Sequence, residues 1–400
     1  MKIVFLAPFG IRPKGTLIAR MLPLSIELER IGHEVVIIAP PYTNPEDSGR
    51  IETVLGIRLI NIRLSRAGAI GAPVMAWRMY RAALIERPDL FHLFKPKGYG
   101  GLAVMLMQLI AAFGVTTPHL FVDCDDLEGK GGMNDLKGYG TLERLLFDFQ
   151  ERFIPRNVHG VTVASRMLEA EMGHNGVLPE CCHYLPNGIF RYRSPGDGTG
   201  VRRLLGIADN APVLLLYTRF FEFAQERLYS ILENLTWKVP ACRILVVGKG
   251  PDNEENALAH AASERGFSDS LIMAGWVEPG DIPDYLAVGD VALYLLDDTL
   301  TNRAKCPAKL TELLAAGIPV VADRVGQAAE YLVDVPATRF SNDAELVARL
   351  ATLLNDPSLR SSIGQMAQEY MHQHFEWATL ARELDEFYRQ KISNSFGVTI

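Results

Sequence analysis

A short stretch near residue 310 combines two lysines, a proline and a glutamate at spacings that suit phosphate binding. Pro307 favours the first turn of a helix, in which Lys309 and Glu312 are three residues apart and share a face. Backbone N–H groups at a helix start attract anions, and Lys305 would add a second cation there. Glu312, about one turn deeper, could accept hydrogen bonds from a ribose diol. We therefore predict a nucleotide diphosphate site between Lys305 and Glu312.

The alternative for this stretch is a solvated Lys–Glu pair at an ordinary helix start. The residues LLAAGIPVV follow at once, and they predict a buried helix, a glycine stop and an apolar strand. Because this context is expected to place the charges in the crevice, it favours the binding site.

A second candidate site is FVDCDDLEGKGG (121–132), where three carboxylates follow a strand. Asp123, Asp125 and Asp126 repel one another unless a ligand, a cation or a shifted pKa compensates. The roles open to them are positioning of an acceptor, base catalysis or metal binding. A helix cap followed by a glycine-rich loop is the structural alternative.

Three further features could contribute to these sites. Lys95 follows the strand that contains His92 and could meet an anionic acceptor, or could be purely structural. The loop PFGIRPKGT (8–16) places Gly15 at a helix start, where it could approach a donor phosphate. Gly248 ends another strand, but VVGKGP lacks the third glycine of a dinucleotide fingerprint.

The elements that must position these residues are short apolar strands alternating with helices, which predicts doubly wound parallel sheets. The sequence predicts strands at 2–8, 34–39, 58–64, 89–94, 119–125, 160–165 and 182–185. A stretch rich in Pro, Gly and Arg (186–206) predicts a linker. A second alternation follows, with strands at 213–219, 243–248, 271–275, 290–296 and 319–322, and helices at 224–235, 254–265, 282–287 and 307–316. Two such domains would face each other across a cleft that forms a ligand site.

Composition and charge narrow the class of protein. The chain has 400 residues, 48% of them hydrophobic, and a net charge of −7, which gives no reason to expect nucleic acid as a partner. Five cysteines without metal-type spacing favour reduced thiols and a cytoplasmic protein. The start MKIVFLAPFG predicts a strand rather than a signal peptide, and we expect no membrane-spanning helix.

The charge is distributed unevenly along the chain. From Arg50 to Lys97 nine basic residues oppose three acidic ones, so this stretch carries +6. It contains an amphipathic segment, Ala72–Ile85, that could lie on an anionic membrane or pack as an ordinary helix. A peripheral contact with the inner membrane face is therefore an open possibility, as is a solvated basic face.

Six segments in order resemble the GT-B glycosyltransferases of family 4. They are RIGHEVVIIAP (30–40), YLPNGI (184–189), VVGKGP (246–251), AGWVEPGDIPDYLAVGDVALY (274–294), KCPAKLTELLAAGIPVVAD (305–323) and FEWATLARELDEFY (375–388). The resemblance covers most of the chain. It implies a GT-B fold and a retaining transfer of a sugar from a nucleoside-diphosphate sugar to a hydroxyl.

The resemblance also implies roles for individual residues. Glu312 matches the glutamate that binds ribose hydroxyls, and Arg219 matches an arginine that meets the diphosphate with its guanidinium fork. Asp125 falls where many members have a histidine near the reaction centre. Because the resemblance implies a retaining transfer without a dedicated protein base, we assign Asp125 a positioning role rather than proton abstraction. Two departures concern the donor: Ala304 replaces a glutamate and Ala224 replaces a lysine, whose charge Lys305 and Lys309 could supply.

We thus expect an acceptor-binding domain at 1–190, joined by the C-terminal helix 375–400, and a donor-binding domain at 191–374. The predicted catalytic residues are Asp125, Arg219 and Lys309. Donor binding is assigned to Gly15, Arg219, Gly248, Lys305, Cys306, Pro307, Lys309 and Glu312, and acceptor binding to Lys95, Asp123 and Asp126. No metal is expected, because a helix start, an arginine and lysines can stabilise a diphosphate.

The acceptor could be a glycan, a lipid-linked molecule or a small molecule, in polysaccharide or glycoconjugate biosynthesis. Closure of the two domains would exclude water. The competing hypotheses are a GT-B nucleotide-sugar epimerase and a non-catalytic nucleotide-sugar-binding protein, the latter favoured by Ala304 and Ala224. A nicotinamide oxidoreductase is disfavoured by the missing glycine fingerprint.

Overall fold

The computed structural model describes residues 1–12, 15–65, 71–135, 138–190, 196–335 and 339–395. Parts of four predicted features lie outside them: Arg66 of the basic stretch, residues 13–14 of the first loop, residues 191–195 of the linker and residues 396–400 of the C-terminal helix.

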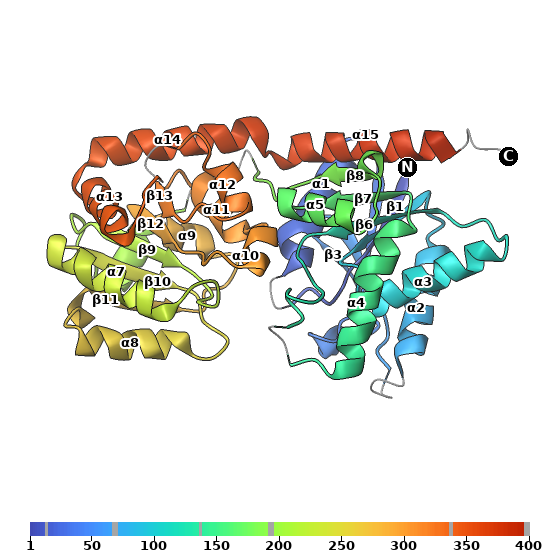
Figure 1. The fold of residues 1–400 in the computed structure, drawn as a ribbon, viewed down its shortest axis with the longest axis horizontal. Helices are drawn as coiled ribbons and strands as arrows, with labels where there is room; N and C mark the ends of the chain where they lie inside the picture. Colours follow the sequence, from blue (N-terminus) through green and yellow to red (C-terminus); the bar gives the residue numbers. More distant parts are fainter. Residues whose placement is uncertain (13–14, 66–70, 136–137, 191–195, 336–338, 396–400) are drawn as a thin grey trace. The chain divides into compact units, whose positions relative to one another are not determined.

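The chain forms two compact units (Figure 1). Unit 1 comprises Met1–Asn187, Ala304–Cys306 and Trp377–Ile400, and unit 2 comprises Gly188–Arg303 and Pro307–Glu376. The sequence predicts that the first domain ends after residue 190 and that the chain joins this domain again from residue 375. It does not predict that the three residues Ala304–Cys306 belong to unit 1.

Unit 1 contains an eight-stranded sheet among its described residues, in the order β3-β4-β2-β1-β5-β6-β7-β8. All neighbouring strands are parallel except β3 and β4, which are antiparallel. The strands are β1 (Lys2–Leu6), β2 (Glu34–Ala39), β3 (Ile51–Val54), β4 (Ile57–Asn61), β5 (Leu90–Phe94), β6 (His119–Cys124), β7 (Gly160–Val163) and β8 (Cys182–Tyr184). The edge strand β3 is not predicted from the sequence, because IETV has neither an apolar run nor a regular alternation of apolar and polar residues.

The helices of unit 1 connect and cover these strands. They are α1 (Leu22–Arg30), α2 (Ala72–Ile85), α3 (Gly98–Ala112), α4 (Thr141–Arg156), α5 (Arg166–His174) and α15 (Trp377–Ser395). The sequence predicts one continuous helix from Gly15 to Ile31, whereas the structure has a π-helical turn at Leu17–Met21 before α1. π-Helical turns often occur at functional sites, and this one carries Arg20.

Unit 2 contains a parallel sheet of five strands among its described residues, in the order β11-β10-β9-β12-β13. The strands are β9 (Val213–Tyr217), β10 (Arg243–Val247), β11 (Leu271–Gly275), β12 (Val291–Tyr294) and β13 (Val320–Ala322). Its helices are α6 (Gly198–Leu204), α7 (Gln225–Lys238), α8 (Glu254–Glu264), α9 (Ile282–Leu286), α10 (Leu300–Ala304, with its last residue in unit 1), α11 (Ala308–Ala315), α12 (Gln327–Tyr331), α13 (Asp343–Asn355) and α14 (Pro357–His374). The predicted α/β fold class with parallel sheets is confirmed.

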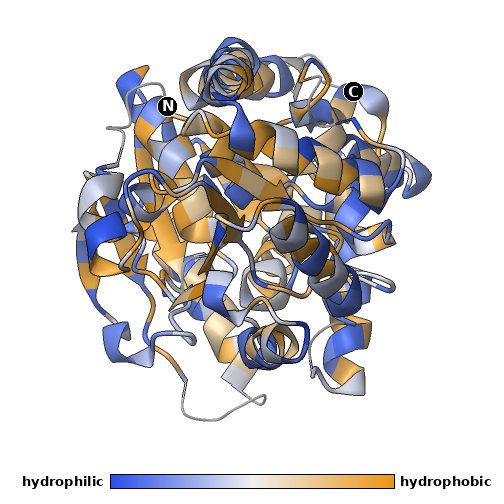
Figure 2. Ribbon diagram, turned by 90° about the vertical axis from the view of Figure 1, so that its left-hand side faces the viewer, coloured by the Kyte–Doolittle hydropathy of each residue, from blue (hydrophilic) through white to orange (hydrophobic). Residues whose placement is uncertain are grey.

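The strands are apolar because helices cover both faces of a parallel sheet. Ile3, Val4, Phe5 and Leu6 of β1 are all fully buried, as are Val213, Leu214 and Leu215 of β9. In Figure 2 the strands are orange, while many of the surrounding helices show both blue and orange. The polar residues that follow the strands therefore stand out against an apolar core.

The C-terminal helix α15 packs into unit 1 through aromatic rings. The rings of Phe387 and Tyr388 lie 5.9 and 4.7 Å from the ring of Phe121. A Cβ atom at Gly160 would lie 2.7 Å from Phe387, so β7 needs a glycine at that position. The Tyr388 hydroxyl forms a 2.5 Å hydrogen bond with Nδ1 of the fully buried His92 in β5.

We predict that Tyr388→Phe lowers the free energy of unfolding by about 1–3 kcal/mol, because it leaves Nδ1 of His92 buried without a donor. Urea unfolding measures the effect. The matched control is Tyr370→Phe, since the Tyr370 hydroxyl donates to the exposed Glu330 carbonyl at 3.3 Å, and we expect a change within about 0.5 kcal/mol. Equal losses in the two variants would contradict the prediction.

Candidate functional site

The ends of β9 and β12 and the start of α11 bring the predicted donor residues of unit 2 together. Tyr217, the last residue of β9, donates a hydrogen bond from its hydroxyl to Oε2 of Glu312 at 2.9 Å. The Lys309 ammonium lies 4.7 Å from the centre of the same ring. Lys309 and Glu312 therefore converge on one tyrosine, which the sequence analysis did not single out. The signal for Tyr217 is the single polar hydroxyl at the end of the apolar run VLLLY.

The start of α11 has no side-chain cap. Pro307 is the N-cap, one residue before the first helical residue, Ala308. The sequence predicts Pro307 inside the first turn, so the structure shifts the helix start by one residue. The backbone N–H groups of that first turn carry the partial positive charge of the helix dipole.

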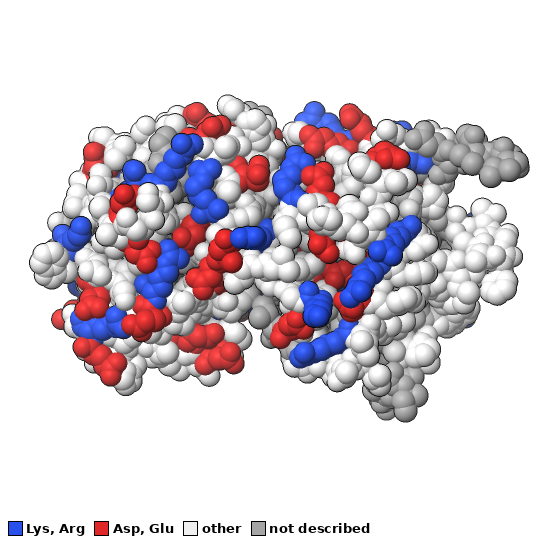
Figure 3. Space-filling model, viewed as in Figure 1, with Lys and Arg blue, Asp and Glu red and all other residues white. Residues whose placement is uncertain are grey.

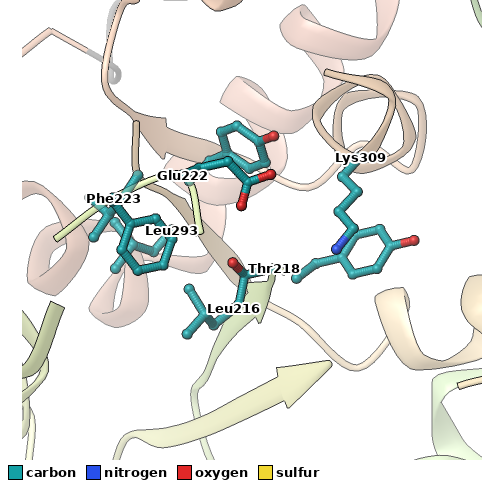
Figure 4. Close-up of a pocket in the computed structure, with 9 residues that line it drawn as sticks. Leu216, Thr218, Glu222, Phe223, Leu293 and Lys309 are labelled. Atoms are coloured by element: carbon teal, nitrogen blue, oxygen red, sulfur yellow. The ribbon is translucent and has the colours of Figure 1, made fainter. Parts of the chain in front are cut away.

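A small pocket lies beside Lys309, at the ends of β9 and β12 (Figure 4). Thr218, Glu222 and Lys309 are its polar lining residues in the close-up, and Leu216, Phe223 and Leu293 form apolar walls. The Glu222 carbonyl accepts hydrogen bonds from the Asp297 backbone at 2.9 Å and the Asn302 side chain at 2.7 Å. These bonds join the loop after β9 to the loop after β12. Thr218 and Glu222 were not predicted from the sequence, because they stand among the aromatic residues of TRFFEF after β9 and form no recognisable motif.

Arg219 and Gly248 lie in the loops that follow β9 and β10. Arg219 is exposed, and its guanidinium lies 5.5 Å from the ring of Phe221. Gly248 has a φ of +126°, and a Cβ there would lie 1.9 Å from the Thr218 carbonyl oxygen. Only glycine fits this close approach of the two loops. Phe220 also has a positive φ, 68°, and such strain is frequent near functional sites.

Lys305 and Cys306 belong to unit 1, unlike the other residues of the predicted nucleotide stretch. The Ser165 hydroxyl donates to the Ala304 carbonyl at 2.7 Å, and Asn187 donates from its side chain to the Cys306 carbonyl at 2.8 Å. The Asn187 backbone N–H also contacts Sγ of Cys306 at 3.1 Å. The stretch from Lys305 to Glu312 is thus continuous in sequence but divided between the two units.

In unit 1 the three predicted carboxylates separate into two networks. Asp123 is fully buried, and Arg20 grips both of its oxygens, at 2.7 Å from Nε and 2.6 Å from Nη2. Burial opposes the charge of Arg20, but Asp123 raises its pKa above the usual value. Arg20 also donates to the Leu185 carbonyl at 2.6 Å and to Asn187 Oδ1 at 3.2 Å.

The Asp123 network continues through Thr162 to β5. The Thr162 hydroxyl donates to Asp123, so Nε2 of His92, 3.2 Å away, donates to Thr162. Burial, followed by the charge of Arg20, lowers the pKa of His92 to about 3, so the ring is neutral near pH 7 and Nδ1 accepts from the Tyr388 hydroxyl. Both carboxylate oxygens of Asp123 therefore accept hydrogen bonds from other side chains.

The second network is centred on Lys95, whose φ is +61°. Its ammonium lies 2.8 Å from Asp125, 2.5 Å from Asp126 and 2.9 Å from Glu128. Burial opposes the charge of Lys95, but these carboxylates raise its pKa well above the usual value. Thr16, beside Gly15, donates to the other oxygen of Asp125 at 3.0 Å. The structure thus brings Lys95, Asp125 and Asp126 together, in a partly exposed cluster.

Glu128 and the glycine-rich loop extend this cluster inward. Lys97 contacts Glu128 and donates to Asn134 at 3.1 Å. Burial opposes the ionisation of Glu128, yet Lys95 and Lys97 lower its pKa to about 2. The Asp126 pKa is raised, first by burial, against the effect of Lys95. Lys97 and Glu128 were not predicted as site residues from the sequence, because neither stands at a recognisable motif spacing.

Glu151 of α4 holds the loop that carries Glu128. Its two oxygens accept from the backbone N–H groups of Glu128 at 2.7 Å and Gly129 at 2.5 Å. A Cβ at Gly129 would lie 2.3 Å from Glu151, which explains the glycine. Burial raises the pKa of Glu151 to about 7. Across the described residues, no group of three or more His, Cys, Asp or Glu side chains is arranged to hold a metal ion.

Two family models match the chain. One describes a glycosyl transferase 4-like domain and matches residues 15–188, and the other describes glycosyl transferases group 1 and matches residues 211–356. Together they cover most of both units.

Curated relatives are mannosyltransferases from mycobacteria. The chain is 27% identical over 218 residues to a GDP-mannose-dependent alpha-(1-6)-phosphatidylinositol monomannoside mannosyltransferase of Mycobacterium tuberculosis, covering 52% of this chain and 55% of that protein. The protein of the same description from Mycolicibacterium smegmatis is 24% identical, over 59% of this chain and 63% of its own. The chain thus matches little more than half the length of these relatives.

Solved structures share the fold over the whole chain. Sucrose-phosphate synthase from Thermosynechococcus elongatus has a TM-score of 0.74 at 18% identity, over 98% of this chain and 100% of that chain. HepE of Anabaena, in complex with UDP and glucose, has a TM-score of 0.71 at 19% identity, over 98% and 100%.

We predict that Arg20→Met lowers the free energy of unfolding by about 3–5 kcal/mol, because it leaves the Asp123 carboxylate buried without its cation. The double variant Arg20→Met/Asp123→Leu should recover part of this loss. The control is Arg152→Met, which breaks the exposed pair with Asp148 and should cost about 1 kcal/mol or less. Urea unfolding compares the four proteins, and a loss below that of the control would refute the role of Arg20.

The raised pKa of Glu151 predicts a pH dependence. A carboxyl that titrates near 7 in the folded chain and near 4.5 when unfolded binds its proton more tightly when folded, so stability is lost as pH rises between these values. Relative to Glu151→Gln, the wild type should lose up to about 3 kcal/mol between pH 5 and 8. The difference between the two proteins is the quantity to measure, because histidines with lowered pKa such as His33 act in both. Parallel curves would contradict the assignment.

Proposed function

Because the chain belongs to the GT-B glycosyltransferases, with a glycosyl transferase 4-like domain before a glycosyl transferases group 1 domain, we propose that it transfers a sugar from a nucleoside-diphosphate sugar to a hydroxyl. The observation that supports this most directly is the convergence of Lys309 and Glu312 on Tyr217 at the uncapped start of α11. We propose retention of the anomeric configuration, by the family resemblance.

In this proposal unit 2 binds the donor. Glu312 accepts hydrogen bonds from the ribose hydroxyls, and Tyr217 holds its carboxylate in place. Arg219, Lys309 and the first N–H groups of α11, after Pro307, stabilise the negative charge that develops on the departing diphosphate. Gly248 allows the close approach of the loops that carry these groups. Gly15, Lys305 and Cys306 stay proposed donor contacts from unit 1.

Unit 1 would bind the acceptor. Asp125 and Asp126 are the partly exposed carboxylates of the Lys95 cluster, with side chains 11% and 22% exposed, and they can accept hydrogen bonds from acceptor hydroxyls. Asp123, which is assigned to the acceptor from sequence, would act by fixing the end of β6 through Arg20. Asp125 would position the hydroxyl that attacks the sugar.

The mannosyltransferase relatives suggest the class of donor and acceptor. Their description names GDP-mannose as donor and a phosphatidylinositol monomannoside as acceptor. The HepE structure contains UDP and glucose. We propose a nucleoside-diphosphate hexose as donor and a lipid-linked acceptor, which would be reached by peripheral contact with a membrane. The proposed reaction would need no metal, since Arg219 and Lys309 can compensate the diphosphate charge.

The test is a thermal-shift screen of the full chain with UDP, GDP and ADP and their sugars. We expect one nucleotide to raise the unfolding temperature, and Glu312→Ala and Lys309→Met to weaken its binding about tenfold or more, close to 1.4 kcal/mol. The control, Lys238→Met, removes an exposed lysine of α7 and should bind as the wild type does. The absence of a response to every nucleotide would refute the donor site.

Turnover with the best nucleotide sugar then separates the candidate activities. Release of nucleotide only in the presence of a hydroxyl acceptor would support transfer. A changed sugar without acceptor would indicate the epimerase. Tight binding without turnover over a broad acceptor set would favour the non-catalytic protein, for which Ala304 and Ala224 are the supporting observations.

A further inference from the structure

One helix of unit 1 is built from a sequence without charge. From Gly98 to Pro118 the chain contains no Asp, Glu, Lys or Arg, and this run forms α3. A helix that is apolar on all sides is normally covered by protein on all sides. The last part of α3 is not covered, because Leu109 is 55% exposed and Phe113, which ends the helix, is 80% exposed.

The exposed end of α3 is part of a wider surface. α3 connects β5 to β6 and α4 connects β6 to β7, so both cross between neighbouring parallel strands in the same direction and lie on one face of the sheet. α2 connects β4 to β5, which are not neighbours in the sheet, and it packs against α3. The neighbours expose apolar side chains too, and we call the whole set the outer apolar face. It comprises Val74, Trp77, Leu84 and Ile85 of α2, Leu109 and Phe113 of α3, and Leu142, Leu145 and Phe149 of α4.

These side chains follow helical spacing rather than chance. Leu142, Leu145 and Phe149 are separated by three and four residues, so they line one side of α4. In unit 2 the exposed large apolar residues lie on separate elements, such as Leu204 on α6, Trp237 on α7 and Met366 on α14. Scattered residues need no explanation, but exposed apolar side chains gathered on helices that pack against one another indicate a binding surface.

The charges of α2 and α3 match an anionic lipid surface, whereas α4 carries both acidic and basic residues, among them Glu143 and Arg144. Arg78 and Arg81 are the charged residues of α2, and α3 has none. In Figure 3 the surface over α2 and α3 is almost entirely white, without basic or acidic side chains. A helix with Trp, Leu and Ile beside arginines and no acidic residue is typical of the membrane interface.

The basic stretch Arg50–Lys97 contributes less to this surface than its sequence suggests. Lys95 and Lys97 are buried among carboxylates. Arg58 pairs with Glu86 at 2.8 Å and Arg50 with Asp47 at 3.2 Å. Apolar contact, assisted by Arg81, would therefore supply most of the attraction.

The lipid contact would be interfacial rather than spanning. α3 has 15 residues, about 22 Å of helix, which is shorter than the roughly 30 Å apolar core of a bilayer. Among the residues that the structure describes, no helix is long and apolar enough to cross a membrane.

We infer that the outer apolar face of unit 1 docks on an anionic lipid bilayer, with the side chains of α2, α3 and α4 entering the headgroup region. This inference deepens the proposed function, because the protein would meet a lipid-linked acceptor at that surface. Binding to the bilayer does not depend on the proposed function; only the relevance of that binding to catalysis rests on it. Lys97 lies 5.9 Å from the ring of Phe147 in α4, so the helix that carries Leu142 and Leu145 also borders the Lys95 cluster.

Co-sedimentation of the full chain with vesicles tests this inference. We expect binding to vesicles of phosphatidylcholine and phosphatidylglycerol, and weaker binding to phosphatidylcholine alone. The variant Phe113→Ser/Leu142→Ser/Leu145→Ser should bind the vesicles at least about tenfold more weakly, because three apolar side chains no longer enter the lipid. Arg81→Gln should weaken binding to the anionic vesicles only.

The matched control is Leu204→Ser/Trp237→Ser, which removes two equally exposed apolar side chains from unit 2 and should bind vesicles as the wild type does. The inference is overturned if the wild type binds neither vesicle, or if the control loses as much binding as the triple variant. It is also overturned if the chain is a dimer that the triple variant dissociates, since a second copy would then cover the face. The nucleotide thermal shift of each variant is recorded in parallel, so that a failed donor site is not mistaken for a failed lipid contact.

Discussion

A buried ion pair between Arg20 and Asp123 connects segments from across unit 1. Arg20 comes from the π-helical turn before α1, and Asp123 from β6. The pair reaches Leu185 and Asn187 after β8 on one side, and Thr162, His92 and Tyr388 on the other. Through Asn187 it also anchors Ala304–Cys306. Because a buried charge is stable only with its partner and a full set of hydrogen bonds, each of these segments has one permitted position.

Buried charges must also be compensated in the neighbouring Lys95 cluster, but there the compensation is incomplete. Three carboxylates share two lysines there, so the cluster carries one excess negative charge while Asp125 and Asp126 keep part of their surface in solvent. The Asp123 network is closed and structural, whereas this cluster can still accept hydrogen bonds. In unit 2, Tyr217 has the corresponding role, since it fixes Glu312 by a hydrogen bond and Lys309 by its ring. In both units, buried polar groups at strand ends hold the groups available to a substrate.

The sequence was sufficient for the features that depend on local spacing. Apolar runs bounded by Gly and Pro predicted both parallel sheets, and α2 has the predicted bounds Ala72–Ile85. The three-residue separation of Lys309 and Glu312 placed them on one face of α11, because a helix turns once in 3.6 residues. Strand β3 was missed, because its short, half-exposed sequence has no period that distinguishes it from a loop.

The tertiary structure alone decided which charges meet. Asp123, Asp125 and Asp126 look equivalent in sequence, but Arg20, 103 residues away, captures the first, and Lys95 captures the others. Likewise, nothing local indicated that Lys305 and Lys309, four residues apart, belong to different units, or that the uncharged α3 leaves Phe113 exposed. The reason is physical: hydrophobic period and turn chemistry act between near neighbours in the chain. The pairing of buried charges and the covering of helix faces depend on segments that only the folded chain brings together.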